Sequence, residues 1–251
     1  MLRNIFTILA LLFMAQEAIA KSAPAGTGFL DVKTNVLIVL NTSSSMNSAA
    51  ASGDSKYPYG VAFDSAGNIY VAKNSTLDDG LEKYTSAGVY EYSWGDYGTD
   101  DGEFHNPYAI AIDSLDNVYV SDANNGRVQR FDTHGVYQSK FSVSTTTVKG
   151  IAVDSSRNVY AVNGNGVVEK FNSAGTRTAT WTNTGADMIA VDSSDNLYVT
   201  RTSTKTIEKY NSSGTLQLSF SAKVAATGNS TYTPVGITVT TDGNIYATDY
   251  T

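Results

Sequence analysis

The sequence predicts an all-β protein assembled from repeated units of four short strands. A motif of ten residues recurs, as VAFDSAGNIY from Val61, IAIDSLDNVY from Ile110, IAVDSSRNVY from Ile151, IAVDSSDNLY from Ile189 and, in weaker form, ITVTTDGNIY from Ile237. One column of it, at Asp64, Asp113, Asp154, Asp192 and Thr240, recurs at intervals of 49, 41, 38 and 48 residues. Helical periodicity is absent from the repeats. Short strands repeating every 40 to 50 residues or so are typical of β-propeller blades.

Each unit contains four segments with strand character, here named a to d from the inside outwards. Strand a is the apolar triplet of the motif and strand b follows its Asn, while strand c ends at Tyr84, Phe131, Phe171 or Tyr210. These segments are rich in β-branched and aromatic residues, which favour strands. The c–d turns contain a glycine that can take a positive φ, at Gly88, Gly135, Gly175 and Gly214. The sequence therefore predicts four full blades and a fifth that stops after strand b.

The repeat resembles the NHL family. The pattern P-x-G-[IV]-[AT]-[VF]-D-x-x-G-N-[IV]-Y-V, followed by R-[IV]-Q-[KR]-F-[DN]-x-x-G, is matched in register by successive units, and Trp94–Phe104 with Asn106-Pro107 resembles the linker that often precedes such a repeat. The resemblance covers about three quarters of the chain. It implies an NHL-type β-propeller, usually of six blades, that mainly binds proteins or other ligands.

The way in which the ring closes stays open between two alternatives. Open propellers expose strand edges, which invite aggregation. Two N-terminal segments, Phe29–Val32 and Val36–Leu40, could supply strands c and d of the last blade and close a five-bladed ring. Alternatively the chain is a truncated member of a six-bladed family, because it ends in the middle of a blade at Tyr250-Thr251.

The chain begins with the pattern of a secretory signal peptide. Arg3 supplies a positive charge, Ile5–Met14 an apolar run and Ala18-Ile19-Ala20 a cleavage site, which predicts cleavage after Ala20. We expect a signal peptide at residues 1–20, a linker with N-terminal strands at 21–57 and the propeller at 58–251. The mature protein is then secreted, periplasmic or on the cell surface, with no membrane insertion after cleavage.

A short stretch after the second N-terminal strand resembles the start of a von Willebrand A-type domain. There an apolar strand leads into D-x-S-x-S, whose oxygens hold a divalent metal. Ser43 and Ser45 match, but Asn41 stands where the family has Asp. The propeller repeats begin soon afterwards and leave no room for such a domain, so a relic of a recombined gene or a plain Ser-rich loop explains this stretch.

Composition excludes several partners. The net charge of −7 and a pI of about 4.7 argue against nucleic acid, which needs basic surfaces, and give no polybasic membrane patch. The chain has no cysteine, so an exported protein would be held together without disulfides.

Strand direction alternates in a blade, so the long b–c and d–a loops share one face, here called the long-loop face. Variable loops on a rigid scaffold usually carry binding. We therefore expect a protein or small ligand to bind there, through Asp78, Asp79, Asp96, Asp100, Asp101, Glu103, His105, Asn124, Asn125, Arg201 and Tyr232.

The acidic part of this set has two interpretations. Clustered carboxylates suit hard cations, which makes Asp96, Asp100, Asp101 and Glu103 weak candidates for binding Ca2+. The alternative is a solvated linker, because the spacing departs from that of the EF-hand loop. The Asp64 column is predicted to cap a–b turns. The Glu/Gln–Lys/Arg pairs of strand c, such as Glu169-Lys170, cannot bridge within the strand because neighbours point to opposite faces, so we expect them to pair between blades.

An enzyme is a poor match to these residues. Some related propellers are lyases or hydrolases whose centres use several histidines, whereas this chain has His105 and His134, which strand order puts on opposite faces. We see no phosphate loop and no nucleophile elbow. The sequence therefore predicts a binding or scaffold module without cofactor. The alternatives are a propeller lyase or hydrolase with a degenerate or relocated centre, and a non-functional fragment of a larger surface protein.

Overall fold

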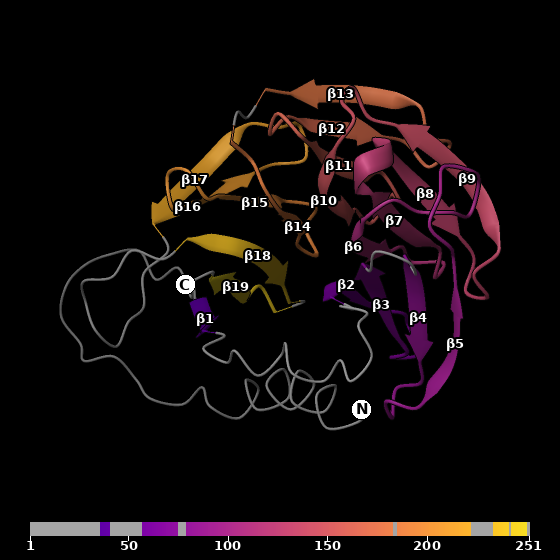
Figure 1. Ribbon diagram of the computed structural model, residues 1–251. Helices are drawn as coiled ribbons and strands as arrows, with labels where there is room; N and C mark the ends of the chain where they lie inside the picture. The colour runs from indigo at the N-terminus through magenta and orange to yellow at the C-terminus, as the bar shows by residue number, and fades with distance from the viewer. Residues whose placement is uncertain are drawn as a thin grey trace.

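The computed structural model describes residues 36–40, 57–74, 79–182, 185–221, 233–240 and 242–249. Within them, four-stranded antiparallel sheets follow one another around a common centre (Figure 1). The first blade contains β2 (Tyr57–Phe63), β3 (Ile69–Asn74), β4 (Gly80–Tyr84) and β5 (Tyr90–Trp94). The second contains β6 (Pro107–Ile112), β7 (Val118–Asp122), the 3-10 helix η2 (Ala123–Asn125), β8 (Arg127–Phe131) and β9 (Tyr137–Ser142).

Two further blades have the same order of strands. The third contains β10 (Val148–Val153), β11 (Val159–Asn163), β12 (Val168–Phe171) and β13 (Arg177–Trp181). The fourth contains β14 (Ile189–Val191), β15 (Leu197–Arg201), β16 (Thr206–Tyr210) and β17 (Leu216–Ser221). In each, strand a is innermost and strand d outermost, which confirms the predicted all-β propeller with four full blades.

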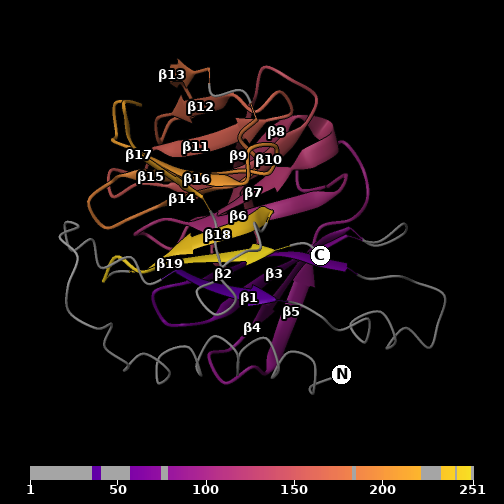
Figure 2. The same ribbon diagram turned by 90° about the vertical axis from the view of Figure 1, so that its left-hand side faces the viewer.

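The fifth sheet has a different composition. It contains β18 (Pro234–Val239), β19 (Ile245–Asp249) and β1 (Val36–Leu40), in the order β1-β19-β18. The N-terminal strand thus lies beside the C-terminal one, as both views show (Figures 1 and 2). However, β1 runs parallel to β19, whereas strand c is antiparallel to strand b in the four full blades. The other predicted N-terminal strand, Phe29–Val32, the signal peptide and the von Willebrand-like stretch lie outside the described residues, and the number of blades stays a prediction.

Apolar clusters between consecutive blades form the core. One joins Tyr70, Ala72 and Leu81 of the first blade to Ile110 and Phe131 of the second, and equivalent clusters lie between each later pair. Because strands a to c carry apolar side chains on both faces, each blade can pack against two neighbours. Within the described residues, no helix has the length and apolar character that crossing a membrane requires.

An aromatic side chain at the end of strand d reinforces the interfaces between the four full blades. It packs on the c–d turn glycine of the next blade: a Cβ at Gly135 would lie 2.7 Å from Trp94, and one at Gly214 would lie 2.2 Å from Trp181. Only glycine leaves room for this contact, and Gly135 also has a φ of 77°. The equivalent Gly88 of the first blade has nothing within 4 Å of the same position.

The first blade is also less covered along its inner strand. Val61 and Phe63 of β2 are 50% and 41% exposed, whereas Ile110, at the position of Val61 in the second blade, is 8% exposed. The difference arises because the preceding blade covers Ile110.

The predicted pairing of strand c charges between blades is wrong for Glu169, Lys170 and Lys209. Lys83 and Arg130 do reach the next blade, where each donates to a c–d turn carbonyl at 3.4 Å, that of Thr133 and of Ser173 respectively. Lys170 lies 3.6 Å from Asp154 and Lys209 lies 3.5 Å from Asp192, each within its own blade, and each stacks on the tyrosine of strand b beside it. Glu169 bonds with Arg177 of its own blade at 2.8 Å. The side chains of Lys170 and Lys209 extend over strand b toward the carboxylate that follows strand a of the same sheet. They therefore pair with that carboxylate and not with one of the next blade.

Candidate functional site

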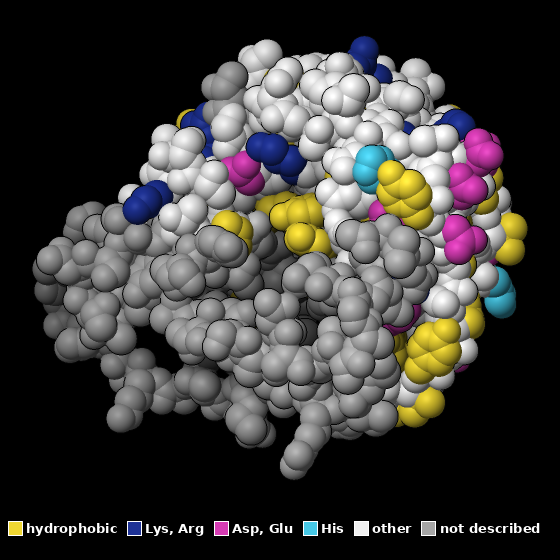
Figure 3. All heavy atoms as spheres, viewed as in Figure 1, with side chains coloured by type: hydrophobic (Ala, Val, Ile, Leu, Met, Phe, Trp, Pro, Cys, Tyr) yellow, Lys and Arg dark blue, Asp and Glu magenta, His cyan; other side chains and the backbone are white. Residues whose placement is uncertain are grey.

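The long b–c and d–a loops meet on one face, as predicted. The b–c loop of the second blade donates from Ala123 N to Asn106 O at 3.2 Å, and that of the third donates from Gly164 N to Thr147 O at 2.9 Å. At the centre of the long-loop face lies a cavity of about 310 Å³, here called the long-loop mouth. Figure 3 shows a central hollow with hydrophobic side chains along its upper edge, and basic and acidic side chains beside them.

One residue of each blade surrounds this mouth. Counting back two residues from the apolar residue that opens the repeat motif gives Tyr59, Tyr108, Lys149, Asp187 and Val235, and the last four line the cavity. The pairing of strands a and b shifts register at this point, between Pro107 and Ile110 and between Val148 and Ile151. β-Bulges reorient side chains in this way. The bulge places Tyr108 and Lys149 on the cavity wall.

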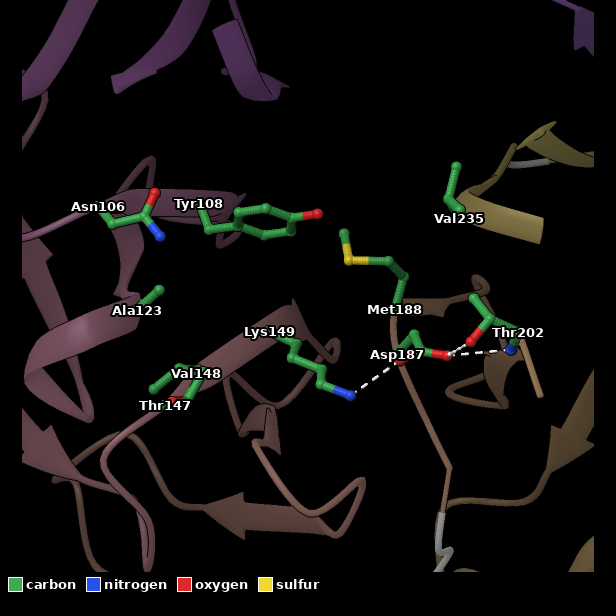
Figure 4. A pocket seen from close by; sticks show the side chains of 10 residues that line it. All are labelled: Asn106, Tyr108, Ala123, Thr147, Val148, Lys149, Asp187, Met188, Thr202 and Val235. Carbon is green, nitrogen blue, oxygen red and sulfur yellow. Dashed lines mark hydrogen bonds and ion pairs between the residues drawn. The ribbon is translucent and has the colours of Figure 1, made fainter. Parts of the chain in front are cut away.

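An ion pair lies in the mouth. Lys149 Nζ is 2.8 Å from Asp187 Oδ1, and both side chains are partly exposed (Figure 4). The other oxygen, Asp187 Oδ2, accepts from Thr202 N at 3.0 Å and from Thr202 Oγ1 at 2.7 Å. Burial alone would raise the pKa of Asp187, but the donors from Lys149 and Thr202 outweigh it and lower the pKa below its ordinary value. The Asp187 carboxylate is therefore ionised and fixed by contacts at both oxygens, whereas the Lys149 ammonium has one ion-pair partner.

Tyr108 and Met188 form the apolar wall of the mouth. In Figure 4 the Tyr108 ring points toward the Met188 side chain across the cavity, and Val235 faces the same space from the fifth sheet. The ring centroids of Tyr108 and Tyr59 are 4.9 Å apart. Burial, with the nearby Tyr59 and Asp187, raises the pKa of Tyr108. Its hydroxyl therefore stays protonated at neutral pH and can donate a hydrogen bond.

Asn106 completes the wall where the linker enters β6. It has a φ of 63°, a left-handed conformation that Asn tolerates better than most residues. Its backbone N donates to Asp79 Oδ2 at 2.6 Å and its Oδ1 accepts from Asn74 Nδ2. Asp79, one of the predicted ligand-binding residues, therefore positions the edge of the mouth.

The acidic linker folds around a buried ion pair. Arg127 Nε is 2.6 Å from Asp122 Oδ2, and the guanidinium also donates to the carbonyls of Thr99, Asp100 and Glu103. Burial raises the pKa of Asp122, an effect opposed by the donors from His105 N, Asn125 and Arg127. Because the linker carbonyls face this arginine, the acidic side chains point outward: Asp96, Asp100 and Asp101 are exposed.

These carboxylates have separate partners. Asp101 Oδ1 lies 2.5 Å from Lys140, which lowers the pKa of Asp101, and Glu103 accepts from Asp100 N at 3.0 Å. Among the described residues no three His, Cys, Asp or Glu side chains gather as a metal site would require. The calcium hypothesis stays untested and gains no ligand set here.

The remaining predicted residues are spread over the long-loop face. The His105 ring contacts the ring of Tyr97 at 5.0 Å, Asn124 is exposed, and Asn125 Nδ2 donates to Gly98 O and Asp122. Arg201 Nη1 is 2.9 Å from Glu208 Oε1. Asp78 and Tyr232 lie outside the described residues. Of the predicted residues that the structure describes, none lines the mouth itself.

A second cavity, here called the turn-side mouth, lies at the a–b turns and is built from repeated residues. Its cavity of about 270 Å³ is lined by Asp113, Asp154 and Asp192 among others. Each carboxylate caps its a–b turn: Asp154 accepts from Ser156 N, Asn158 N and Nδ2, and Tyr160 Oη, all within 3.1 Å. The predicted turn-capping role is confirmed, and it leaves no ring of uncommitted carboxylates in this part of the chain.

Comparisons with known proteins agree with this fold. A family model described as an NHL repeat matches residues 104–131, and one described as a beta-propeller repeat matches residues 49–76. The chain is a β-propeller, and one of its repeats matches the NHL model. A search of curated proteins finds no match.

Solved structures of several propellers are similar. A streptogramin B lyase structure has a TM-score of 0.60 at 16% identity, over 76% of this chain and 62% of that one. Virginiamycin B lyase from Staphylococcus aureus has a TM-score of 0.59 at 17% identity, over 76% and 63%. The RRP9 WD40 repeats have a TM-score of 0.58 at 13% identity, over 68% and 53%. The aligned region thus spans under two thirds of each of these chains, and identities this low speak for the fold alone.

Sequence reasoning missed the column of residues around the long-loop mouth. The available signal was variation at one aligned position: the apolar, Asp, Asn and Tyr columns of the motif largely repeat their chemistry, while the position two residues before the motif reads Tyr, Tyr, Lys, Asp and Val. The bulge that turns these side chains toward the axis has no distinct sequence mark, so strand alternation alone misplaces them.

Proposed function

We propose that this protein is a binding module, not an enzyme, and that its ligand or partner protein docks on the long-loop face with the long-loop mouth at the centre. One observation carries the proposal: the residues around this mouth change chemistry from blade to blade, whereas those around the turn-side mouth repeat. Repetition is what packing and turn capping require. Variation in a rigid frame is what recognition of an asymmetric ligand requires.

Two further features support a binding role over catalysis. His105 lies in the linker on the long-loop face, while His134 lies in a c–d turn and donates from its backbone to Asp132. The two histidines therefore serve different faces and cannot share a metal or a proton transfer. The mouth supplies one ion pair and apolar walls, which suit recognition more than bond cleavage. The signal-peptide pattern of residues 1–20 leads us to propose export as well.

Site-specific photocrosslinking tests the face. Tyr97, in the linker on the long-loop face, and Val136, beside a c–d turn, are each 55% exposed. A photoreactive phenylalanine is placed at one or the other position, and the protein is irradiated in the cells that make it. We expect discrete adducts from position 97 and none from position 136. Equal adducts from both positions, or adducts from 136 alone, would refute the proposal.

A further inference from the structure

We propose that the long-loop mouth binds the carboxylate of a small molecule or chain end with an apolar body, with Lys149 as the anchor for the anion and Tyr108 and Met188 as the wall for the body. This rests on the proposed function and adds the chemical class of the ligand. The inference comes from an imbalance in the mouth between hydrogen-bond donors and acceptors.

Lys149 is the first donor. Its ammonium carries three N–H groups, and Asp187 is its one partner in the part of the chain that the structure describes. The side chain is 33% exposed and its Nζ points toward Asp187 at the edge of the cavity, as the close-up shows (Figure 4). Two N–H groups are thus available to an incoming anion.

Asp187 cannot play the equivalent role for a cation. One of its oxygens accepts from Lys149, and the other accepts twice from Thr202. These donors hold the carboxylate in place and neutralise it. A cationic ligand would have to displace Lys149, whereas an anionic ligand can share it.

Two neutral donors face the same space. The Tyr108 hydroxyl is protonated at neutral pH, since its pKa is raised by burial and by the nearby Tyr59 and Asp187. The Asn106 amide uses its oxygen to accept from Asn74, which leaves its NH2 group for the cavity, where Figure 4 shows it. An acceptor-rich group such as a carboxylate satisfies these donors together with Lys149.

The walls and the size of the mouth select the rest of the ligand. Met188, Val148, Val235 and Ala123 line the cavity beside the Tyr108 ring. Thioether and ring surfaces of this kind favour aromatic or branched aliphatic groups. At about 310 Å³ the cavity is at the lower end of ligand sites, which run from about 300 to 1,000 Å³. The ligand is therefore about the size of a phenyl ring with a short acidic tail.

A carboxylate attached to an apolar group can come from two kinds of molecule. It is either a free aromatic or aliphatic acid, or the C-terminal residue of a peptide that ends in an apolar side chain. The test therefore uses both as probes: phenylpropionate with phenylpropionamide as its uncharged counterpart, and an acetylated Gly-Gly-Phe peptide with a free or an amidated C-terminus.

Calorimetric titration of the full chain with these probes tests the proposal. We expect saturable binding of at least one acid, about tenfold or more tighter than binding of its amide, because a charge-assisted bond to Lys149 is lost in the amide. Lys149→Met, which keeps the apolar stem, should abolish that preference. Lys205→Met, which removes an exposed lysine of a b–c loop on the same face, should leave it unchanged. Met188→Ala should weaken acid and amide alike.

Each outcome separates the alternatives. Binding of the peptide alone assigns the chain end as the ligand, and binding of phenylpropionate alone assigns the free acid. Equal affinity for acid and amide, no effect of Lys149→Met, or no binding of any probe overturns the proposal. If no probe binds and position 97 still gives adducts, the chemical class is wrong while the binding face stands. Thermal melts of each variant exclude misfolding as the cause.

Discussion

The long-loop mouth and the turn-side mouth lie at opposite ends of the same inner strands, yet their residues have different roles. At the turn-side mouth the carboxylates of Asp113, Asp154 and Asp192 are each engaged by their own turn. At the long-loop mouth the equivalent positions hold Tyr108, Lys149 and Asp187, which share no common chemistry. In a repeat protein, the residues that agree between repeats hold the fold, and the residues that differ are available for function.

The largest effect is expected at the turn-side mouth. Asp154→Ala removes the acceptor for two backbone amides of the turn, for the Asn158 side chain and for the Tyr160 hydroxyl. It also removes the carboxylate that pairs with Lys170. Partly buried donors left without partners cost about 1 to 3 kcal/mol each, so we expect a loss of about 3 kcal/mol in the free energy of unfolding. Urea denaturation measures it, with Ser156→Ala in the same turn as the control. A loss below about 0.5 kcal/mol would remove the distinction between the mouths.

A matched pair of glycines tests how the blades that form both mouths are held together. Gly135→Ala should cost about 1 kcal/mol for its positive φ and about 2 kcal/mol more for the overlap with Trp94. Gly88 has the same φ but no atom within 4 Å of an added Cβ, so Gly88→Ala should cost only the roughly 1 kcal/mol that the positive φ causes. Equal losses in urea denaturation would mean that the aromatic contact does not hold neighbouring blades together.

Acid should weaken the turn-side mouth. Burial would raise the pKa of Asp192, but hydrogen bonds from Asn196, Ser194 and Tyr198 outweigh it and lower the pKa. A lowered folded pKa gives stability that is complete above the unfolded value of about 3.9 and is lost as the pH falls through the folded value. The melting temperature should therefore fall less between pH 6 and about pH 3 in Asp192→Asn than in the wild type. A steeper fall in the variant would contradict this sign.

The smallest effect on stability is expected at the long-loop mouth. Lys149→Met breaks a partly exposed ion pair, and such pairs contribute about 0 to 1 kcal/mol. We expect a change in the free energy of unfolding of about 0.5 kcal/mol or less, measured by urea denaturation beside Asp154→Ala. A loss as large as that of Asp154→Ala would make Lys149 a structural residue and this mouth equivalent to the other.

Sequence reasoning predicted the parts of the molecule that repeat. The motif placed strands a and b, and the spacing of Asp154 to Asn158 identified a turn cap, because local geometry determines both. It could not place Lys149 on the axis, since a β-bulge depends on how two strands pair. It also assigned Lys170 to the next blade, although strand a of the same sheet offers Asp154 at 3.6 Å. The parallel β1 had no precedent in the repeats.

Methyl NMR of Met188 tests the central claim most directly. The sequence has four methionines, and of these Met188 lies within the propeller repeats and lines the long-loop mouth. The protein is labelled at the methionine methyl groups, Met188→Leu assigns the signal, and phenylpropionate and the Gly-Gly-Phe peptide are titrated in turn. We predict that the Met188 signal moves saturably with an acid and needs about tenfold more of the amide for the same shift, while the other methionine signals stay in place. A bound probe that leaves the Met188 signal unmoved would contradict the account, because the ligand would then bind away from the long-loop mouth.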